Sequence, residues 1–169
     1  ILELGAGYGR VLDYLTEPSL NNHVFAVERS HLFSQFLKKR FDGQVEIFEE
    51  DLRYFHSSQK FDTILFLWGG IVELLPVKQF LIIKKYKYLL KKGGTLVVES
   101  MLSDELPENA NKQSAFEYTA SENDIEINFY ILPPKKLLSM AKILGFSSVE
   151  QIIYRTNGKR SRLMTFMTA

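Results

Sequence analysis

Four residues near the start of the chain have the types and the spacing of a ligand-binding loop. Gly5, Gly7 and Gly9 follow a short apolar run, and the acid Glu3 lies two residues before the first glycine. Glycines let a backbone approach a ligand where a Cβ atom would clash, and the amides that open the following helix point at that ligand. The pattern predicts a strand, a cofactor-binding loop and a helix, although a glycine loop that only joins strand to helix would look the same.

The glycine spacing and the acid restrict the class of ligand that this loop could bind. The loop reads GxGxG, whereas the dinucleotide fingerprint reads GxGxxG. A carboxylate in this loop would repel a pyrophosphate and attract an ammonium group. The acid followed by GxGxG resembles the first motif of the Rossmann-like, class I S-adenosylmethionine-dependent methyltransferases. That resemblance implies S-adenosyl-L-methionine as the cofactor, a molecule with an adenosine, a sulfonium and a free amino acid but no phosphate.

Glu28 is a second acid in an informative position. It ends the β-rich run HVFAVE, residues 23–28, and follows the last loop glycine by about the spacing of a dinucleotide-binding acid. There it would stand at the tip of the second strand, where a carboxylate can accept both hydroxyls of a ribose. A solvated acid at a strand end is the alternative interpretation.

Another acidic group follows the third predicted strand, Val45–Phe48, as Glu49, Glu50 and Asp51. In the resembling family an acid at this point bonds the adenine amino group, and the next residue packs on the ring. Asp51 and Leu52 match that pattern best. Glu50 remains an alternative, and a merely solvated turn is the simpler interpretation.

The run FDTILFLW, residues 61–68, is almost continuously apolar, as expected of a central strand covered on both faces. The residues after it, 69–75, resemble the family's fourth motif, which lines the methyl-transfer site. Leu67 and Trp68 are therefore expected beside the methionine part of the cofactor, unless Trp68 is only a core aromatic. The cofactor-binding residues implied by the resemblance are Glu3, Gly5, Ala6, Gly7, Gly9, Glu28, Arg29, Asp51, Leu52, Leu67 and Trp68.

Two acids beyond the carboxyl ends of strands, Glu73 and Glu99, are candidate catalytic bases. Each has an alternative role as a structural or cofactor-orienting acid. The sulfonium is already a good leaving group, so alignment of nucleophile and methyl supplies much of the catalysis, and a base is needed only for an acceptor protonated at working pH. His56 is a weaker candidate. No metal site is expected.

Composition sets further bounds. The 169 residues carry a formal net charge of +1, 46% are hydrophobic and none is cysteine. These values predict a single domain over residues 1–169, cytoplasmic, without a disulfide, a membrane span or a general attraction to nucleic acid. The resemblance implies that it is a methyltransferase domain. Because the chain begins at Ile1, inside a predicted central strand, we expect residues upstream of it to be missing.

The remaining elements follow from periodicity and turn signals. Helices are predicted over Tyr8–Leu15, from Ser30 to Gly43, from Pro76 to Lys92 and from Pro133 to Gly145, and Gly93-Gly94 is expected to separate the third helix from a strand over Thr95–Ser100.

Residues 101–132 form a predicted substrate-cover insert with a hairpin of two strands, 115–119 and 125–132. Its aromatic residues either line the substrate site or form a satellite packing cluster: Phe116, Tyr118, Phe129 and Tyr130. Two further strands, 149–154 and 163–167, flank Asn157-Gly158, a strong hairpin signal. A short hairpin makes its strands antiparallel, and an antiparallel last strand is typical of the resembling family.

Together these features predict an α/β fold: a doubly wound, mostly parallel seven-stranded sheet with an antiparallel last strand, strand order 3-2-1-4-5-7-6 and helices on both faces. The expected activity is methyl transfer from S-adenosyl-L-methionine to an O or N atom of a small molecule. The alternatives are a methyltransferase-like domain that binds cofactor or a partner without turnover, and an NAD(P)-dependent oxidoreductase. The GxGxG spacing, Glu3 and the closing hairpin disfavour the oxidoreductase.

Overall fold

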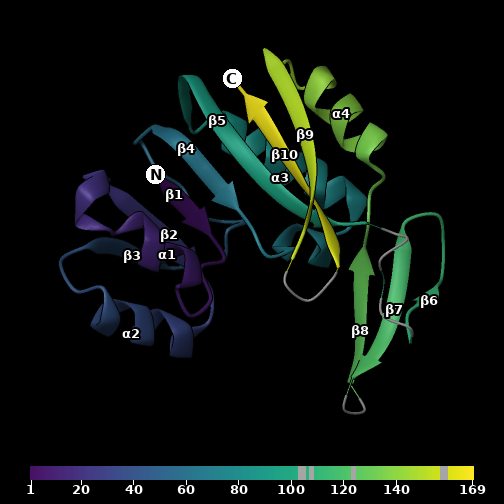
Figure 1. The fold of residues 1–169 in the computed structure, drawn as a ribbon, viewed down its shortest axis with the longest axis horizontal. Coiled ribbons are helices and arrows are strands. Elements are labelled where there is room, and N and C mark those ends of the chain that lie inside the picture. Colours follow the sequence, from purple (N-terminus) through teal and green to yellow (C-terminus); the bar gives the residue numbers. More distant parts are fainter. Residues whose placement is uncertain (103–105, 107–108, 123–124, 157–159) are drawn as a thin grey trace.

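The computed structural model describes residues 1–102, 106, 109–122, 125–156 and 160–169 (Figure 1). Its centre is a seven-stranded sheet with the order β3-β2-β1-β4-β5-β10-β9. The strands of this sheet are β1 (Leu2–Leu4), β2 (Val24–Glu28), β3 (Val45–Glu49), β4 (Phe61–Phe66), β5 (Leu90–Met101), β9 (Ser148–Arg155) and β10 (Ser161–Thr168). The first five strands run parallel, whereas β10 is antiparallel to both β5 and β9. The predicted sheet and its order are confirmed.

The remaining elements of the described chain are helices and a smaller sheet. The helices are α1 (Arg10–Leu15), η1 (Pro18–Leu20), α2 (His31–Arg40), η2 (Gly70–Glu73), α3 (Pro76–Lys87) and α4 (Pro134–Ile143). The smaller, antiparallel sheet consists of β6 (Asn111–Lys112), β7 (Glu117–Glu122) and β8 (Ile125–Tyr130). None of these helices is long and apolar enough to cross a membrane.

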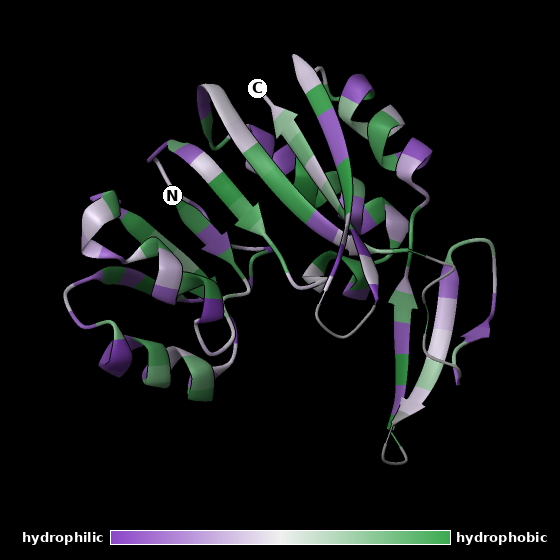
Figure 2. Cartoon of the chain, viewed as in Figure 1, coloured by the Kyte–Doolittle hydropathy of each residue, from purple (hydrophilic) through white to green (hydrophobic). Residues whose placement is uncertain are grey.

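Helices cover both faces of the main sheet, because successive side chains of a strand point to opposite sides. On one face Val24 packs with Leu12 of α1 and Leu37 of α2. The next residue of β2, Phe25, belongs to the larger apolar cluster of the other face, together with Ile83 of α3 and residues of α4. Figure 2 shows the middle of β4 and β5 as largely hydrophobic, which fits central strands covered on both sides.

The glycine pair at 93 and 94 does not end a helix, contrary to the prediction. Helix α3 ends at Lys87, and both glycines lie inside β5, which begins at Leu90. The pairing of β4 with β5 shifts register between Phe61 and Thr63, so the glycines accommodate an irregularity in the ladder. Apolar residues at helical spacing continue past Lys87, so the sequence did not indicate the turn between α3 and β5.

Other boundaries moved by a few residues. Helix α1 begins at Arg10, because Gly9 has a left-handed φ of 86° and serves as its N-cap. Helix α2 ends at Arg40, before Gly43. The predicted strands 149–154 and 163–167 lie within β9 and β10, and the Asn157-Gly158 turn lies outside the described residues.

The small sheet is attached to the main core by two stacked rings. Tyr118 of β7 and Phe129 of β8 lie with ring centroids 5.8 Å apart and an interplanar angle of 15°. Both are buried in the larger apolar cluster. The aromatic residues of the insert therefore contribute to packing, which was one of the two interpretations left open by the sequence.

A substitution at Gly94 tests whether the irregularity in β5 requires a glycine. A Cβ atom at this position would lie 2.9 Å from the Phe61 carbonyl oxygen and 3.0 Å from that of Asp62, and neither backbone atom has room to move. We expect Gly94→Ala to lower the free energy of unfolding by roughly 3 kcal/mol, the scale of overpacking. Gly93→Ala is the matched control: it meets open space at φ +79° and should lose only about 1 kcal/mol. Urea denaturation that gave equal losses would contradict this account.

Candidate functional site

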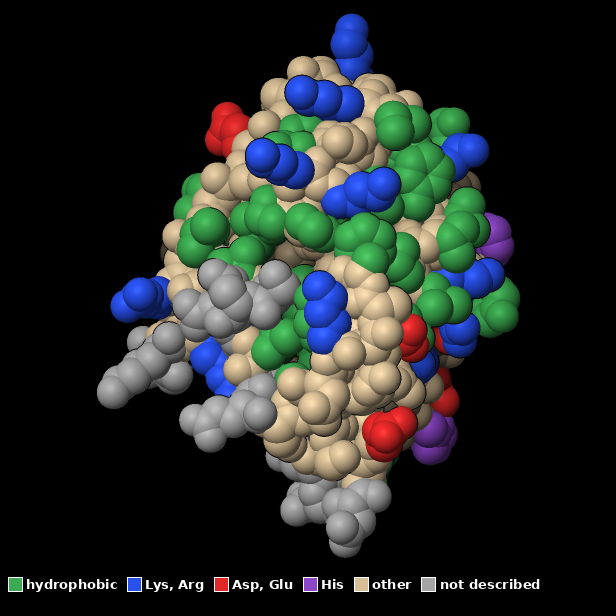
Figure 3. Space-filling view, turned by 90° about the vertical axis from the view of Figure 1, so that its right-hand side faces the viewer, with side chains coloured by type: hydrophobic (Ala, Val, Ile, Leu, Met, Phe, Trp, Pro, Cys, Tyr) green, Lys and Arg blue, Asp and Glu red, His purple; other side chains and the backbone are tan. Residues whose placement is uncertain are grey.

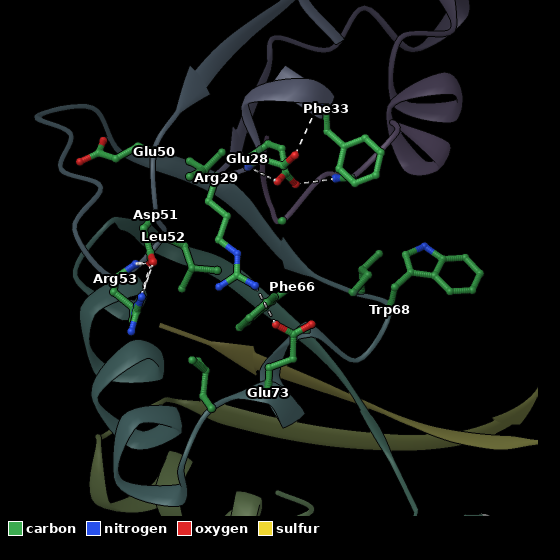
Figure 4. A pocket seen from close by; sticks show the side chains of 17 residues that line it. Glu28, Arg29, Phe33, Glu50, Asp51, Leu52, Arg53, Phe66, Trp68 and Glu73 are labelled. Carbon is green, nitrogen blue, oxygen red and sulfur yellow. Dashed lines mark hydrogen bonds and ion pairs between the residues drawn. The ribbon is translucent and has the colours of Figure 1, made fainter. Parts of the chain in front are cut away.

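A cavity of about 320 Å³ opens at the carboxyl ends of the parallel strands. It lies where the strand order reverses direction between β1 and β4, the position at which open α/β sheets bind ligands. Its lining comes from the last residues of β2 and β4 and from the segments that follow β1, β2, β3 and β4: Gly5, Gly7, Val27, Glu28, Arg29, Ser30, Phe33, Glu50, Asp51, Leu52, Arg53, Phe66, Leu67, Trp68, Gly70, Glu73 and Leu74 (Figure 4). Four loops far apart in sequence thus form one site.

The three loop glycines have two different roles. Gly5 and Gly7 line the cavity with φ values of +68° and +56°, and a Cβ atom at either position would meet no protein atom within 4 Å. Gly9 faces away, and a Cβ there would lie 2.7 Å from the Phe41 ring and 2.8 Å from Leu37. Gly5 and Gly7 therefore leave space for a ligand, whereas Gly9 lets α1 approach α2.

Glu28 connects the glycine loop to the start of α2. One carboxylate oxygen accepts the Gly7 N–H at 2.8 Å, and the other accepts the Ser30 N–H at 2.7 Å. The side chain is buried. Each carboxylate oxygen has a second lone pair, so Glu28 retains capacity to accept hydrogen bonds from a ligand in the cavity.

On the opposite side of the cavity, Asp51 is held by Arg53. Its two carboxylate oxygens accept from the Arg53 side chain at 2.5 to 3.0 Å, and these hydrogen bonds lower the pKa of Asp51. The carbonyl of Leu52 accepts from the Tyr86 hydroxyl at 2.8 Å, which fixes this loop on α3. The loop is therefore held in place independently of any ligand.

An ion pair joins the two sides of the cavity. The Arg29 guanidinium lies 3.3 Å from the Glu73 carboxylate, and in Figure 4 the Arg29 side chain extends from the end of β2 toward Glu73 on η2. Both side chains are about two thirds exposed, at 67% and 63%. A pair this exposed contributes little stability, so a ligand can displace it at small cost.

Trp68 has an unusual backbone conformation and an exposed ring. Its φ of +58° lies in the left-handed region, which a bulky residue rarely adopts. The Trp68 N–H donates to a Glu99 carboxylate oxygen at 3.0 Å, and the Arg10 guanidinium lies 3.5 Å from the centroid of the indole. In Figure 4 the indole points away from the other labelled side chains. Glu99 and Arg10 thus hold Trp68 from its backbone and its ring.

Glu3 and Glu99 are buried acids that do not line the first cavity. Burial, and next the charge of Glu28, raises the pKa of Glu3 to about 8. One oxygen of each carboxylate is buried without a hydrogen-bond partner among the described residues. The Arg162 Nε lies 4.0 Å from the Glu99 carboxylate, which offsets part of its charge.

A second cavity, of about 540 Å³, lies between η2, the small sheet and the start of β10. Its lining is Trp68, Gly69, Val72, Glu73, Met101, Asn109, Ala120, Ser121, Ile127, Asn128, Phe129, Arg160 and Arg162. Trp68 and Glu73 line both cavities. The two cavities therefore adjoin at these two residues.

Nine of the thirteen site residues expected from the sequence line the first cavity: Gly5, Gly7, Glu28, Arg29, Asp51, Leu52, Leu67, Trp68 and Glu73. The other four, Glu3, Ala6, Gly9 and Glu99, lie outside its lining. Three further lining residues, Ser30, Phe33 and Arg53, were not expected from the sequence. Ser30 and Phe33 lie at the start of the helix that follows Glu28, and this position after a predicted strand end could have indicated them as site residues.

The fold and the site together define the class of this protein. A doubly wound sheet in the order 3-2-1-4-5-7-6, with a glycine loop at the reversal point and a closing antiparallel strand, is the Rossmann-like fold of class I methyltransferases. In a comparison with protein-family models, residues 1–94 match a methyltransferase domain. The chain therefore belongs to the methyltransferase domain family and is an S-adenosylmethionine-dependent methyltransferase.

Solved structures of methyltransferases have the same fold at low sequence identity. One is an amino pentose methyltransferase from Micromonospora echinaspora, which is involved in calicheamicin biosynthesis and was solved with S-adenosylmethionine. It is 15% identical with a TM-score of 0.71, and the alignment covers 98% of this chain and 81% of that chain. Another is the 1,6-didemethyltoxoflavin-N1-methyltransferase from Burkholderia thailandensis, solved with 1,6-didemethyltoxoflavin and S-adenosylhomocysteine. It is 17% identical with a TM-score of 0.72, and the alignment covers 99% of this chain and 69% of that chain. An S-adenosylmethionine-dependent methyltransferase from Clostridium acetobutylicum is 15% identical with a TM-score of 0.73, covering 99% and 82%. A comparison with curated proteins gives no match.

The buried Glu3 predicts a pH dependence of stability. Its pKa is raised to about 8 in the folded protein and is near 4.5 when exposed, so the folded state binds the extra proton between these values. Stability due to Glu3 is therefore full below pH 4.5 and is lost as the pH rises to about 8, by at most roughly 5 kcal/mol. We expect Glu3→Gln to unfold at a higher temperature than the unmodified protein at pH 8, and the gap to shrink toward pH 5. Thermal melts over this range with a constant gap would contradict the assignment.

Proposed function

We propose that this chain transfers a methyl group from S-adenosyl-L-methionine to an O or N atom of a small molecule. The observation that supports this most strongly is the pair of adjoining cavities. The first is built by the glycine loop and the strand-end acids, and the second lies under the insert. A cofactor in the first and an acceptor in the second would meet at Trp68 and Glu73.

The residues of the first cavity fit the chemistry of the cofactor. Gly5 and Gly7 leave open space beside the backbone, which a methionine moiety needs in order to approach. We propose that Glu28 accepts hydrogen bonds from the ribose hydroxyls. Asp51 would bind the adenine amino group, with Leu52 against the ring. A volume of about 320 Å³ lies within the range of small-molecule sites.

We assign supporting roles to the four expected residues outside the lining. Gly9 and Ala6 pack the glycine loop against the core, since Ala6 belongs to the apolar cluster of α1 and α2. Glu3 lies beneath the loop, where its second oxygen is free to accept a hydrogen bond. Glu99 holds the Trp68 backbone and so shapes the wall between the cavities.

The chemistry supplied by S-adenosyl-L-methionine, when it is bound, is an electrophilic methyl group on a sulfonium leaving group. The chain's own contribution is to align an acceptor lone pair with that methyl and to exclude water, which supplies several kcal/mol of the barrier. We propose Glu73 as the residue that accepts a proton when the acceptor carries one, since Glu73 lines both cavities.

We further propose that residues 1–169 act as one methyltransferase domain and that residues 101–132 cover the acceptor. In support, the insert contributes seven described residues to the lining of the second cavity, the first of them Met101. None of the described residues of the insert lines the first cavity. The solved neighbours include an amino pentose methyltransferase and a 1,6-didemethyltoxoflavin-N1-methyltransferase, which favours a small-molecule acceptor.

Calorimetric titration with S-adenosylhomocysteine and, separately, with NADH tests the cofactor site. We expect micromolar binding of the first and none of the second. Gly7→Ala should weaken S-adenosylhomocysteine binding at least tenfold, because its Cβ would enter the cavity. Gly43→Ala is the matched control, since Gly43 has a similar φ of +70° and open space but does not line the cavity. Equal affinity of the two variants would show that the loop is not the cradle.

A second prediction concerns Glu28. We expect Glu28→Ala to weaken S-adenosylhomocysteine binding by about 1 to 3 kcal/mol, the scale for hydrogen bonds to a charged acceptor. Glu46→Ala removes an exposed acid from the neighbouring strand β3, outside the cavity, and should leave the affinity unchanged. Circular dichroism of both variants checks that the fold is intact. Unchanged affinity in Glu28→Ala would exclude Glu28 from the site.

A further inference from the structure

Two arginines line the second cavity at the start of β10. Arg160 immediately precedes this strand, and Arg162 is its second residue. No ion pair within the described residues involves Arg160. Among the described residues of the lining the cations outnumber the acids, since only Glu73 adds a carboxylate there and it is already paired with Arg29. The described lining therefore carries an excess of positive charge.

The buried Nε of Arg162 is an unused hydrogen-bond donor among the described residues. Its side chain is 23% exposed, and its Nε is buried with no hydrogen-bond partner among the described residues. Its nearest carboxylate is that of Glu99, at 4.0 Å, a distance too long for a hydrogen bond. The other Glu99 oxygen already accepts the Trp68 N–H. A partly buried guanidinium with unused donors is costly unless an anion or another acceptor binds it.

The rest of the lining suits a small organic molecule. Val72, Ile127 and Phe129 provide apolar surface, and Asn128 and Ser121 provide neutral polar groups. Figure 3 views the molecule from the side that carries α4 and the small sheet, where apolar side chains reach the surface among Lys and Arg side chains. An acceptor with one apolar part and one charged part fits the lining of the second cavity.

We propose that the methyl acceptor carries an anionic oxygen group, a carboxylate or a phosphate, which Arg160 and Arg162 bind. Guanidinium groups present parallel N–H donors that match two oxygens of either anion. This inference rests on the proposed function, because it assigns the second cavity to the acceptor. It adds the chemical class of that acceptor, which the family and the fold leave open.

The chain's single tryptophan gives a direct measurement, because Trp68 lines the second cavity. Protein saturated with S-adenosylhomocysteine is titrated with inorganic phosphate and, separately, with acetate at constant ionic strength, and Trp68 fluorescence is recorded. We expect a saturable change in the millimolar range. Saturation by both anions indicates that either source fits, and saturation by one identifies a phosphate or a carboxylate.

Variants then test the two arginines. Arg160→Gln and Arg162→Gln should each weaken anion binding at least fivefold. Arg155→Gln is the matched control, because Arg155 pairs with Ser161 across the same hairpin but does not line the cavity. Should Arg162→Gln fail to fold because Glu99 loses its neighbouring cation, the exposed Arg160 still decides the question.

The possible failures are distinguishable. Absence of saturable binding of both anions, or equal weakening by Arg155→Gln, overturns the anion-binding inference while S-adenosylhomocysteine still binds. Absence of S-adenosylhomocysteine binding in the calorimetric titration instead overturns the proposed function. Unchanged S-adenosylhomocysteine affinity in Arg160→Gln shows that the cofactor cavity is intact in that variant.

Discussion

One buried acid holds the loops of the first cavity together. The Glu28 carboxylate accepts the amides of Gly7 and Ser30, and its backbone carbonyl accepts from the Ser34 hydroxyl and the Glu50 amide. This single residue therefore joins the segments after β1, β2 and β3. Burial of a carboxylate costs free energy unless hydrogen bonds compensate for it, so the loop geometry and the position of Glu28 determine one another. The ligand groups that Glu28 would bind are presented to a site that is already formed.

The boundary between the two cavities depends on a second buried acid. Glu99, near the end of β5, accepts the Trp68 amide and lies beside Arg162 of the neighbouring strand β10. The left-handed backbone at Trp68 costs free energy, and a charge-assisted hydrogen bond offsets part of it. Strained backbone of this kind concentrates at functional sites. Here it turns the chain at the end of β4 at a residue that lines both cavities, with the indole against the Arg10 guanidinium.

Local sequence signals were sufficient for the main sheet and for most of the first cavity. An acid at a strand end and a loop of alternating glycines are both patterns of neighbouring residues. Gly7, Glu28 and Asp51, which line the first cavity, could therefore be predicted from the sequence. Long-range effects were not visible in this way. The Gly93-Gly94 pair looked like a helix end, because only the pairing of β4 with β5 shows that it lies within a strand. The position of Glu99 outside the lining of the first cavity likewise could not be predicted, because it depends on contacts between strands distant in sequence.

The small sheet rests on the core through the stacked pair Tyr118 and Phe129, and every described residue that lines the first cavity precedes residue 75. Changes along the outer strands β6, β7 and β8 therefore reshape the second cavity without disturbing the hydrogen bonds of the cofactor cradle. Outside the shared stretch 68–74, the described linings come from separate parts of the chain, residues 5–67 for the first cavity and residues 101–162 for the second. If the second cavity holds the acceptor, as proposed, descendants of such a scaffold can exchange one acceptor for another by drift in the later part, while selection keeps the earlier part constant.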